Sequence, residues 1–441
     1  MQPYTYPDLG MTITPGPGPN TSDDIVSFKV PDTHDPVTIA NDLTHQPAGV
    51  RTCAAALGIK PDGRPDFTIM TLPQPGPAAA VFSQSRCPSD TTLRGRECLA
   101  NGQLQAVAVG SGNANIFTPD STSAVARLVT LLERELGIEA PQILLSLTGR
   151  IGVPLPMKCF ETGIPSLAKT LCESNLDAAS EAILTSDAGP KTGSVALGDV
   201  VLAGIAKGAG MVEPHMATML VYLFTNAQLD HAMLQEMLGH AVNASFNRLS
   251  IDAETSPSDT VALLSTAATP LLPEQIAPFR QALTALCVKL ARDMASQGEG
   301  VTKCIEATVH SPWGIAHAER LAKQVINSTL IKSAAHSARL NWGPIVAAIG
   351  KPVSGHDDPI LDRDQMVIRL QGYDVFRYGQ TIDVAQQSLF EALRDNKTIQ
   401  IEVTLGPGGA LARAWGSDLS PAYIAINAGE PVSSVMTPHH V

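Results

Sequence analysis

Hydrophobic and polar positions along this chain follow two periods, an alternating one typical of strands and a longer one typical of helices. Short apolar runs around Phe67, Val81, Val107 and Leu144 predict strands. Between the last two runs, the segment 121–137 repeats apolar residues at helical spacing and ends on a glycine, so it predicts a helix. The first part of the chain therefore mixes α and β structure.

The second half of the chain continues this mixture. A hairpin is expected to turn at Gly198 and Asp199, and the run TMLVYLFT predicts the next strand. Helices are expected over about 229–246 and 273–296, and again within 316–334. The last hundred residues alternate strand, helix and strand. Antiparallel hairpins fit this pattern better than a regular series of parallel crossovers.

Residues 1–22 differ from the rest in being rich in Pro, Gly, Thr and Asn, as in TPGPGPNTSDD. Such a composition favours a disordered tail over a packed element. We therefore expect the folded part to begin near residue 23.

Composition and charge narrow the classes of function. The chain has 441 residues, of which 44% are hydrophobic, so it can bury a large core in two or three domains. Its net charge of −12 comes without any cluster of Lys and Arg, which argues against binding nucleic acid through phosphate contacts.

The seven cysteines never occur as CxxC, and this spacing supports neither a metal site nor a disulfide framework. No apolar run approaches the ~20 residues that span a bilayer, and the N-terminus lacks the basic start of a secretory signal. We expect a protein of the cytoplasm with no membrane partner.

The densest cluster of unusual residues is IAKGAGMVEPHMATMLVYLFT, over 205–225. Glycines follow Lys207, and Ala217-Thr218 stands at the start of an apolar strand. A threonine hydroxyl is a poor nucleophile without a base. Cleavage of the chain before Thr218 would supply one, because the freed α-amine has a pKa of about 7.7–8.0. The alternative is that Thr218 simply begins a strand, where β-branched residues are common.

This segment resembles the self-cleavage site of the ornithine acetyltransferase family, also called glutamate N-acetyltransferase. The resemblance extends from about residue 45 to residue 428 and includes six further motifs in the same order. They are GSGNAN (110–115), LTGRIG (147–152), TSD (185–187), SFNRLSIDAETSPSDT (245–260), GEGVTK (298–303) and WGSDLSPAYIAIN (415–427).

The resemblance implies that the bond between Ala217 and Thr218 is cut and that Thr218 is the catalytic nucleophile. It also implies that Thr148 and Gly149 form the oxyanion hole. By itself, a Thr-Gly pair after a strand is more often an ordinary turn. Lys207 keeps the spacing of the family, where its charge either favours the neutral amine of Thr218 or holds a substrate carboxylate. A single lysine is otherwise usually a surface charge.

The remaining site residues carried over by resemblance are expected to bind substrate. They are Thr185, Glu299 and Asn427, with Lys207 and Thr218 in addition. Glu299 lies between two glycines, which allow its carboxylate to approach an ammonium group closely, although the tripeptide alone also fits an exposed turn.

The chain departs from the family pattern near the substrate. After Asn427, Val432 stands where the family has Thr or Ser, so Ser433 is the candidate one residue later. Arg150 follows Gly149 where a small apolar residue is expected. It either grips a second carboxylate or forms a surface ion pair. These departures fit an enzyme of specialised metabolism as well as one of arginine biosynthesis.

The resemblance implies a ping-pong transfer of an acetyl group from an N-acetylornithine-like donor to a glutamate-like amine, without metal or cofactor. The implied fold is α+β, an αββα-type sandwich shared by the residues 23–217 and 218–310, with a smaller C-terminal α/β domain over 311–441. Two α and two β chains would form a heterotetramer. The rivals are an amidohydrolase or aminopeptidase on the same scaffold and a catalytically dead paralogue.

Overall fold

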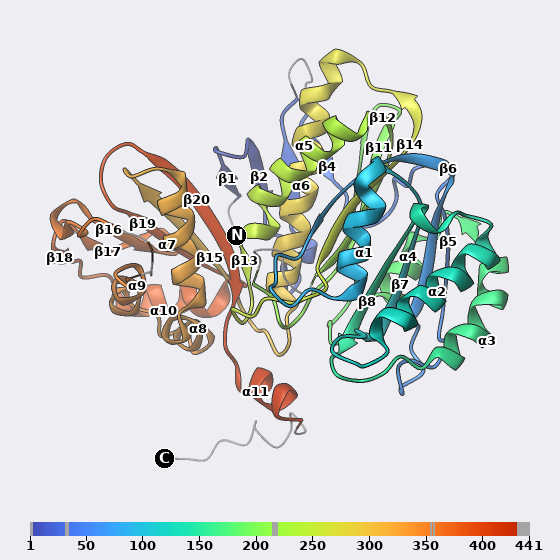
Figure 1. Cartoon of the computed structure of the whole chain (residues 1–441). Helices are drawn as coiled ribbons and strands as arrows, with labels where there is room; N and C mark the ends of the chain where they lie inside the picture. Colours follow the sequence, from blue (N-terminus) through green and yellow to red (C-terminus); the bar gives the residue numbers. More distant parts are fainter. Residues whose placement is uncertain (1–2, 31–34, 214–218, 353–354, 356–357, 430–441) are drawn as a thin grey trace.

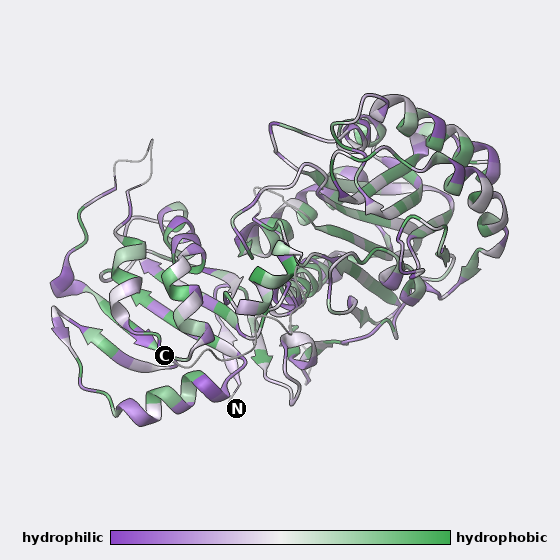
Figure 2. Cartoon of the chain, turned by 90° about the horizontal axis from the view of Figure 1, so that it is seen from below, coloured by the Kyte–Doolittle hydropathy of each residue, from purple (hydrophilic) through white to green (hydrophobic). Residues whose placement is uncertain are grey.

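The computed structural model describes residues 3–30, 35–213, 219–352, 355 and 358–429. Figure 1 shows a larger lobe and a smaller lobe, with the C-terminal helix below their junction. In Figure 2 the strands of both lobes are largely hydrophobic, and polar residues gather on the outward faces of the helices. Each lobe therefore has a core built on its own sheet.

The larger lobe contains a nine-stranded sheet. Its strands are β5 (Arg51–Ala55), β6 (Phe67–Phe82), β7 (Gln103–Asn113), β8 (Ile143–Arg150), β9 (Cys172–Glu173), β10 (Lys191–Leu197), β11 (Val200–Lys207), β12 (Leu220–Gln228) and β14 (Thr260–Pro270). The long strand β6 belongs to two halves of this sheet. Its residues 67–71 pair with β5 and β7, and its residues 78–82 pair with β14. Between them, residues 76–77 also pair with β7, after a register shift that follows Thr71.

The two halves of the sheet lie face to face. The evidence is that alternate residues of the same strand belong to two different cores. Tyr222 and Phe224 of β12 pack in the core between the halves, together with Val107 of β7. Val221 and Leu223 face the opposite way, toward a core on the outer face of this half of the sheet. This alternation is what a strand buried on both faces requires.

Helices cover the outer face of each half. The helix α2 (Ser121–Leu136) and α3 (Met157–Leu167) pack on the half that contains β7 and β8. The helices α5 (His231–Ala244) and α6 (Pro273–Ser296) pack on the half that contains β11 and β12. The shorter helices are α1 (Asp90–Cys98) and α4 (Leu176–Ala182). The layers are therefore helix, sheet, sheet and helix, and the predicted αββα sandwich is confirmed.

Several predicted elements are confirmed in detail. The helix α2 ends at Gly137, whose φ of 68° is the left-handed cap that glycine favours. The helix α6 has the expected bounds, and the hairpin pairs Leu197 with Val200 as expected. The two strands expected around Phe67 and Val81 are instead one strand, because β6 continues through a bulge from one half of the sandwich to the other.

The smaller lobe contains a seven-stranded sheet. Its strands are β13 (Leu249–Ser250), β15 (Cys304–Ser311), β16 (Val367–Leu370), β17 (Tyr373–Arg377), β18 (Gln380–Thr381), β19 (Thr398–Thr404) and β20 (Ala410–Ser417). Its helices are α7 (Ile315–Asn327), α8 (Thr329–His336), α9 (Trp342–Ile349), α10 (Gln386–Asp395) and α11 (Pro421–Ala428). This lobe begins before the expected residue 311, because β15 lies between β19 and β20 in its sheet.

The N-terminal segment differs from the expected disordered tail. Four strands form a sheet of their own, namely β1 (Tyr4–Tyr6), β2 (Met11–Thr14), β3 (Ile25–Phe28) and β4 (Val37–Ile39), with the 3-10 turn η1 (Thr21–Asp23) between them. Tyr6, Ile13 and Phe28 are buried in the core that includes α6. The expectation is wrong for residues 3–22, because every second residue of these short strands is apolar and packs on the larger lobe.

None of the helices in the described ranges is long and apolar enough to cross a bilayer.

Candidate active site

A cavity of about 530 Å³ opens where the ends of β8 and β11 meet the chain that follows α6. It collects residues from eight separate stretches of the described sequence. The predicted site residues in its lining are Thr148, Gly149, Thr185, Lys207, Glu299 and Asn427. The structure therefore brings together the predicted site residues that lie within the described ranges.

Thr148 and Gly149 stand near the end of β8, opposite Ser111 and Gly112 of β7. Gly149 has a φ of 128°, which disfavours any residue with a side chain. A Cβ on Gly149 would also lie 2.3 Å from the carbonyl carbon of Gly112. Only glycine fits here. Its backbone therefore lines the cavity directly, next to Thr148.

Lys207 is the last residue of β11 and is buried. Its Nζ donates to Thr148 Oγ1 at 3.5 Å. Burial lowers the pKa of Lys207, although the charge of Asp187 opposes that shift. A lysine of this kind places a positive charge beside the predicted oxyanion hole and exchanges its proton more readily than a surface lysine.

Asp187 is a site residue whose role the sequence analysis missed. Its Oδ1 accepts from Lys191 Nζ at 2.6 Å and from the backbone N–H of Gly208 at 2.8 Å, and its Oδ2 accepts from the Thr185 N–H at 3.1 Å. Burial alone raises the pKa of Asp187, but the charges of Lys191 and Lys207 outweigh it and hold the pKa far below the usual range. Asp187 thus fixes Thr185 and the residue after Lys207. The TSD motif contained this signal, in a carboxylate two residues after a threonine that is predicted to bind substrate.

Asp259 is a second residue that the sequence analysis missed. It is fully buried, and its Oδ1 accepts from the backbone N–H of Met219 at 2.6 Å. Its Oδ2 has no hydrogen-bond partner within the described ranges. Burial raises the pKa of Asp259 well above its usual value, while Met219 and Lys207 lower it only in part. The SPSDT motif contained this residue, but a single Asp gave no sign of its burial.

Glu299 and Asn427 are in contact in the lining of the cavity. Asn427, on α11, donates through Nδ2 to Glu299 Oε2 at 2.9 Å. The backbone N–H of Glu299 is held by the Ala209 carbonyl at 2.9 Å, and a Cβ on Gly210 would lie 2.8 Å from the Glu299 carboxyl carbon. The smallness of Gly210 therefore lets this carboxylate lie against the segment after β11.

The part of the cavity that Lys60 and Arg150 line, which we name its mouth, is basic. Lys60 lines it with a buried side chain, and its Nζ donates to the Pro65 carbonyl at 2.7 Å. Burial lowers the pKa of Lys60 to about 8, and the charge of Arg64 adds to this shift. Arg150 also lines the cavity, and it is exposed. This mouth suits a ligand that carries a carboxylate in addition to its reacting group.

Three predicted residues, Ala217, Thr218 and Ser433, lie outside the described residues. The structure describes the neighbours of the first two. In the antiparallel pairing of β11 with β12, Lys207 stands opposite Leu220. The twelve residues 208–219 therefore connect two strand ends that lie side by side, and one of these ends, Lys207, lines the cavity.

The described side chains of the cavity suit chemistry at a carbonyl group. A hydroxyl and a buried ammonium group lie together at Thr148 and Lys207, and the carboxylate of Glu299 lines the same cavity. Among the described residues, no three His, Cys, Asp or Glu side chains converge in the way that a metal site requires.

Comparisons with known proteins show which family the chain belongs to. A model of the ArgJ family matches residues 51–429. The arginine biosynthesis bifunctional protein ArgJ 2 of Clostridium acetobutylicum is 36% identical over 382 residues, covering 86% of this chain and 97% of that protein. Glutamate N-acetyltransferase Oat2 of Streptomyces clavuligerus is 36% identical over 388 residues, with coverage of 86% and 97%.

Among solved structures, the arginine biosynthesis bifunctional protein ArgJ from Bacillus halodurans aligns with a TM-score of 0.44 at 32% identity, covering 47% of this chain and 98% of that one. The family model spans most of the chain, and the two curated relatives exceed 30% identity over nearly their whole length. This chain belongs to the ArgJ family.

Proposed function

We propose that this protein is a self-cleaving N-acetyltransferase that moves an acetyl group from an N-acetylornithine-like donor to a glutamate-like amine through an ester on Thr218. The names of its relatives support the reaction class, since they include glutamate N-acetyltransferase and arginine biosynthesis bifunctional protein. The observation that carries the proposal is the meeting of Thr148, Gly149 and Lys207 at one cavity, beside the strand that begins after residue 218.

Self-cleavage would begin with attack of the Thr218 hydroxyl on the Ala217 carbonyl. The amide becomes an ester as the nitrogen of Thr218 takes up a proton, and water then cleaves the ester. The products are the chains 1–217 and 218–441, and Thr218 gains a free α-amine. Both products contribute strands to the same half of the sandwich, because β11 precedes the cut and β12 follows it. The cleaved chains would therefore stay together.

Transfer would use the new amine as the base. The α-amine of Thr218, with a reference pKa of about 7.7–8.0, removes the proton of its own hydroxyl as that oxygen attacks the donor's acetyl carbonyl. Thr148 and Gly149 would stabilise the tetrahedral oxyanion, and the buried charge of Lys207 lies close enough to assist. The donor amine leaves, the acceptor amine attacks the acetyl ester, and Thr218 is regenerated.

Substrate binding is assigned to other residues that line the cavity. Glu299, oriented by Asn427, suits the ammonium group of an amino acid. Thr185 lines the same cavity, and its backbone N–H is held by Asp187. Lys60 and Arg150 at the mouth suit a carboxylate. Ser433 stays a proposed contact of the C-terminal segment. Lys60 and Arg150 would bind the carboxylate of many amino acids, so they fit an enzyme of specialised metabolism as well as one of arginine biosynthesis.

Two further features belong to the proposal. We expect a heterotetramer of two α and two β chains, as the family resemblance implies. We also expect the cytoplasm as its location, and the seven free thiols in the structure suit a reducing compartment.

The proposal is tested by intact mass spectrometry and by following both products of the reaction. The purified chain should appear as two species that meet at the bond between residues 217 and 218. Incubation with N-acetylornithine should add one acetyl group to the 218–441 species, and glutamate should remove it as N-acetylglutamate. Thr218→Ala should leave the chain whole and inactive.

The same measurements separate the rival activities. Release of acetate at an equal rate with and without glutamate would identify an amidohydrolase, because water rather than an amine would then resolve the acyl-enzyme. A wild-type chain that stays whole and takes up no acetyl group would identify a dead paralogue.

A further inference from the structure

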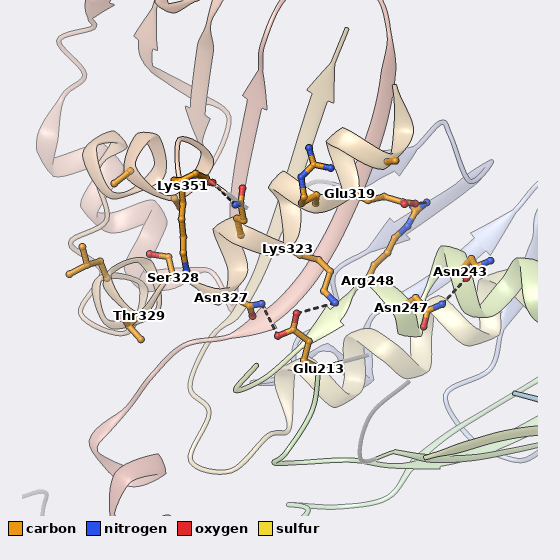
Figure 3. Close-up of a pocket in the computed structure, with 17 residues that line it drawn as sticks. Glu213, Asn243, Asn247, Arg248, Glu319, Lys323, Asn327, Ser328, Thr329 and Lys351 are labelled. Carbon is orange, nitrogen blue, oxygen red and sulfur yellow. Dashed lines mark hydrogen bonds and ion pairs between the residues drawn. The ribbon is translucent and has the colours of Figure 1, made fainter. Parts of the chain in front are cut away.

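A second and larger cavity, of about 1230 Å³, lies between the two lobes (Figure 3). One wall comes from α7, α8 and α9 of the smaller lobe, and the other from α5 and the 3-10 turn η5 (Phe246–Arg248) of the larger lobe. Glu213 also lines this cavity. It precedes Thr218 by five residues in the sequence, so a residue of the cavity wall lies close in the chain to the proposed cleavage site.

The side chain of Glu213 is bound by two residues of α7. Asn327 donates through Nδ2 to Glu213 Oε2 at 2.9 Å, and Lys323 Nζ lies 3.1 Å from Glu213 Oε1. The side chains of Glu213 and Lys323 are only 20% and 17% exposed. Figure 3 shows both contacts converging on the carboxylate from one helix. Two donors four residues apart on a helix face fix the direction of this carboxylate as well as its position.

The backbone around Glu213 is held by a different segment. The N–H groups of Met211 and Val212 donate to the two carboxylate oxygens of Asp252 at 2.6 and 2.7 Å. The Glu213 N–H donates to the Glu254 carbonyl at 2.9 Å. The residues before the proposed cut are thus held by backbone contacts to 251–254 and by side-chain contacts to α7.

The other end of the processing segment is also held. The Met219 N–H donates to buried Asp259, and the Met219 carbonyl accepts from the Thr260 N–H at 3.1 Å. Only the five residues 214–218 lie between Glu213 and Met219. The described residues on both sides of the proposed cut are therefore held in place, and orientation of the reacting atoms is a large part of the barrier to an intramolecular attack.

We propose that Glu213 is a positioning residue for self-cleavage, and that α7 of the smaller lobe is the part of the fold that holds it through Lys323 and Asn327. This inference rests on the proposed self-cleavage. It assigns to the smaller lobe a role in maturation in addition to substrate binding through α11. Once the bond before Thr218 is cut, the anchor has no further role, so transfer by the cleaved enzyme does not depend on it.

The experiment follows cleavage of the freshly synthesised full-length chain over time by intact mass spectrometry. The variants are Glu213→Ala, Lys323→Ala, and the reversed pair Glu213→Lys with Lys323→Glu. Each single variant is expected to slow cleavage by about tenfold or more, because the carboxylate loses its orientation. The reversed pair should restore most of the rate, since the attraction across the contact is regained and Asn327 can present its amide oxygen to the new lysine.

A matched control lies in the same cavity. Glu319 of α7 binds Arg248 at 2.7 Å and so also links the two lobes. Its partner Arg248, unlike Glu213, does not belong to the segment just before the proposed cut. Glu319→Ala should cleave at the wild-type rate. Thermal unfolding of each uncleaved chain, trapped with Thr218→Ala, should show that the variants are folded, and kcat per cleaved molecule should equal that of the wild type.

The possible results are distinct. Wild-type cleavage with equally fast cleavage of Glu213→Ala and Lys323→Ala overturns the inference and leaves the proposed function standing. Equal slowing by Glu319→Ala, or no restoration in the reversed pair, also overturns it, because the effect would then come from docking of the lobes in general. A wild-type chain that stays whole overturns the proposed cleavage and the inference together.

Discussion

Two of the groups of buried charges in the described ranges differ in how they are paired. At the first, which we name the junction cluster, Asp24, Arg292, Glu306 and Lys397 join the N-terminal sheet, α6 and the smaller lobe. Asp24 lies 3.0 Å from Arg292 and 2.6 Å from Lys397, and Arg292 lies 3.9 Å from Glu306. Glu306 also accepts from the indole N–H of Trp415 at 3.1 Å. Two cations thus face two carboxylates.

The second group, the cavity cluster, consists of Asp187, Lys191, Lys207 and Asp259. Asp187 and Lys191 form a buried pair. Lys207 has the Thr148 hydroxyl as its side-chain contact at 3.5 Å, and no carboxylate of the described residues lies within ion-pair distance of it. Burial lowers the pKa of Lys207 and raises the pKa of Asp259, so both shifts favour the neutral forms.

The difference distinguishes structural charges from chemical ones. Full pairing satisfies buried charges and ties separate parts of the chain together, whereas incomplete pairing leaves a proton easy to move and a charge free to meet a ligand. The junction cluster should therefore govern stability, and the incompletely paired members of the cavity cluster, Lys207 and Asp259, should govern reaction.

The largest effect is expected from Arg292→Met, which leaves Asp24 and Glu306 buried with less compensation. Breaking a buried pair in this way is expected to cost about 3–5 kcal/mol of unfolding free energy. Urea denaturation measures the loss, and kcat/KM of the folded fraction should stay near that of the wild type. Arg280→Met is the matched control, because its pair with Glu236 is exposed and should contribute at most about 1 kcal/mol. Equal losses in the two variants would contradict the structural role of the junction cluster.

The opposite result is expected for Lys207→Met. Loss of a preorganised charge beside the oxyanion hole should lower kcat/KM by about a hundredfold or more, while stability changes little because an incompletely paired buried charge is removed. Steady-state kinetics and urea denaturation of the same preparation measure both quantities. Lys191→Met is the companion variant, and it should lose stability because it leaves Asp187 without its closest partner. Full activity in Lys207→Met would remove Lys207 from the mechanism.

The sequence predicted the elements of this fold better than their connections. The helix α6 and the hairpin at Gly198 follow from local spacing and turn residues, which act over a few positions. The continuity of β6 across both halves of the sandwich could not be read locally, because its bulge is set by partners far away in the chain. The ordered N-terminal sheet was missed for a similar reason, since its strands are short and are stabilised by packing on α6.

The candidate site shows the same division. Thr148, Gly149 and Lys207 stood in motifs that predicted their proximity, and one cavity contains all three. Asp187 and Asp259 stood in motifs as well, but their importance lies in burial and in contacts to backbone N–H groups. Neither the burial of a single Asp nor its contacts to backbone N–H groups produces a pattern that can be recognised in the sequence.

A smaller effect is expected from Lys60, whose pKa burial lowers to about 8. Below that pH the side chain is charged and attracts a substrate carboxylate, so KM for an acidic acceptor should rise by about threefold to tenfold between pH 7 and pH 9. Lys60→Met should remove this part of the pH dependence, and the exposed Lys158→Met should not. Because the folded pKa is below the unfolded value, the stability of the wild type relative to Lys60→Met should increase as pH rises from about 8 toward 10.5. A KM profile that is identical in wild type and Lys60→Met would contradict this assignment.

The smallest effect is expected from Arg150→Val, which gives the chain the apolar residue expected next to the oxyanion hole. Arg150 lines the cavity but is exposed, so its attraction for a carboxylate is weakened by water and salt. KM for glutamate should rise by about threefold, with kcat unchanged, and the difference from wild type should shrink at high salt. Arg150→Lys should keep most of the effect, because a point charge suffices at an exposed site. KM for glutamine, which lacks the second carboxylate, should be the same in all three proteins. A rise in KM for both acceptors would instead mean that Arg150 shapes the cavity wall, and an unchanged KM for both would make it a surface charge with no part in substrate choice.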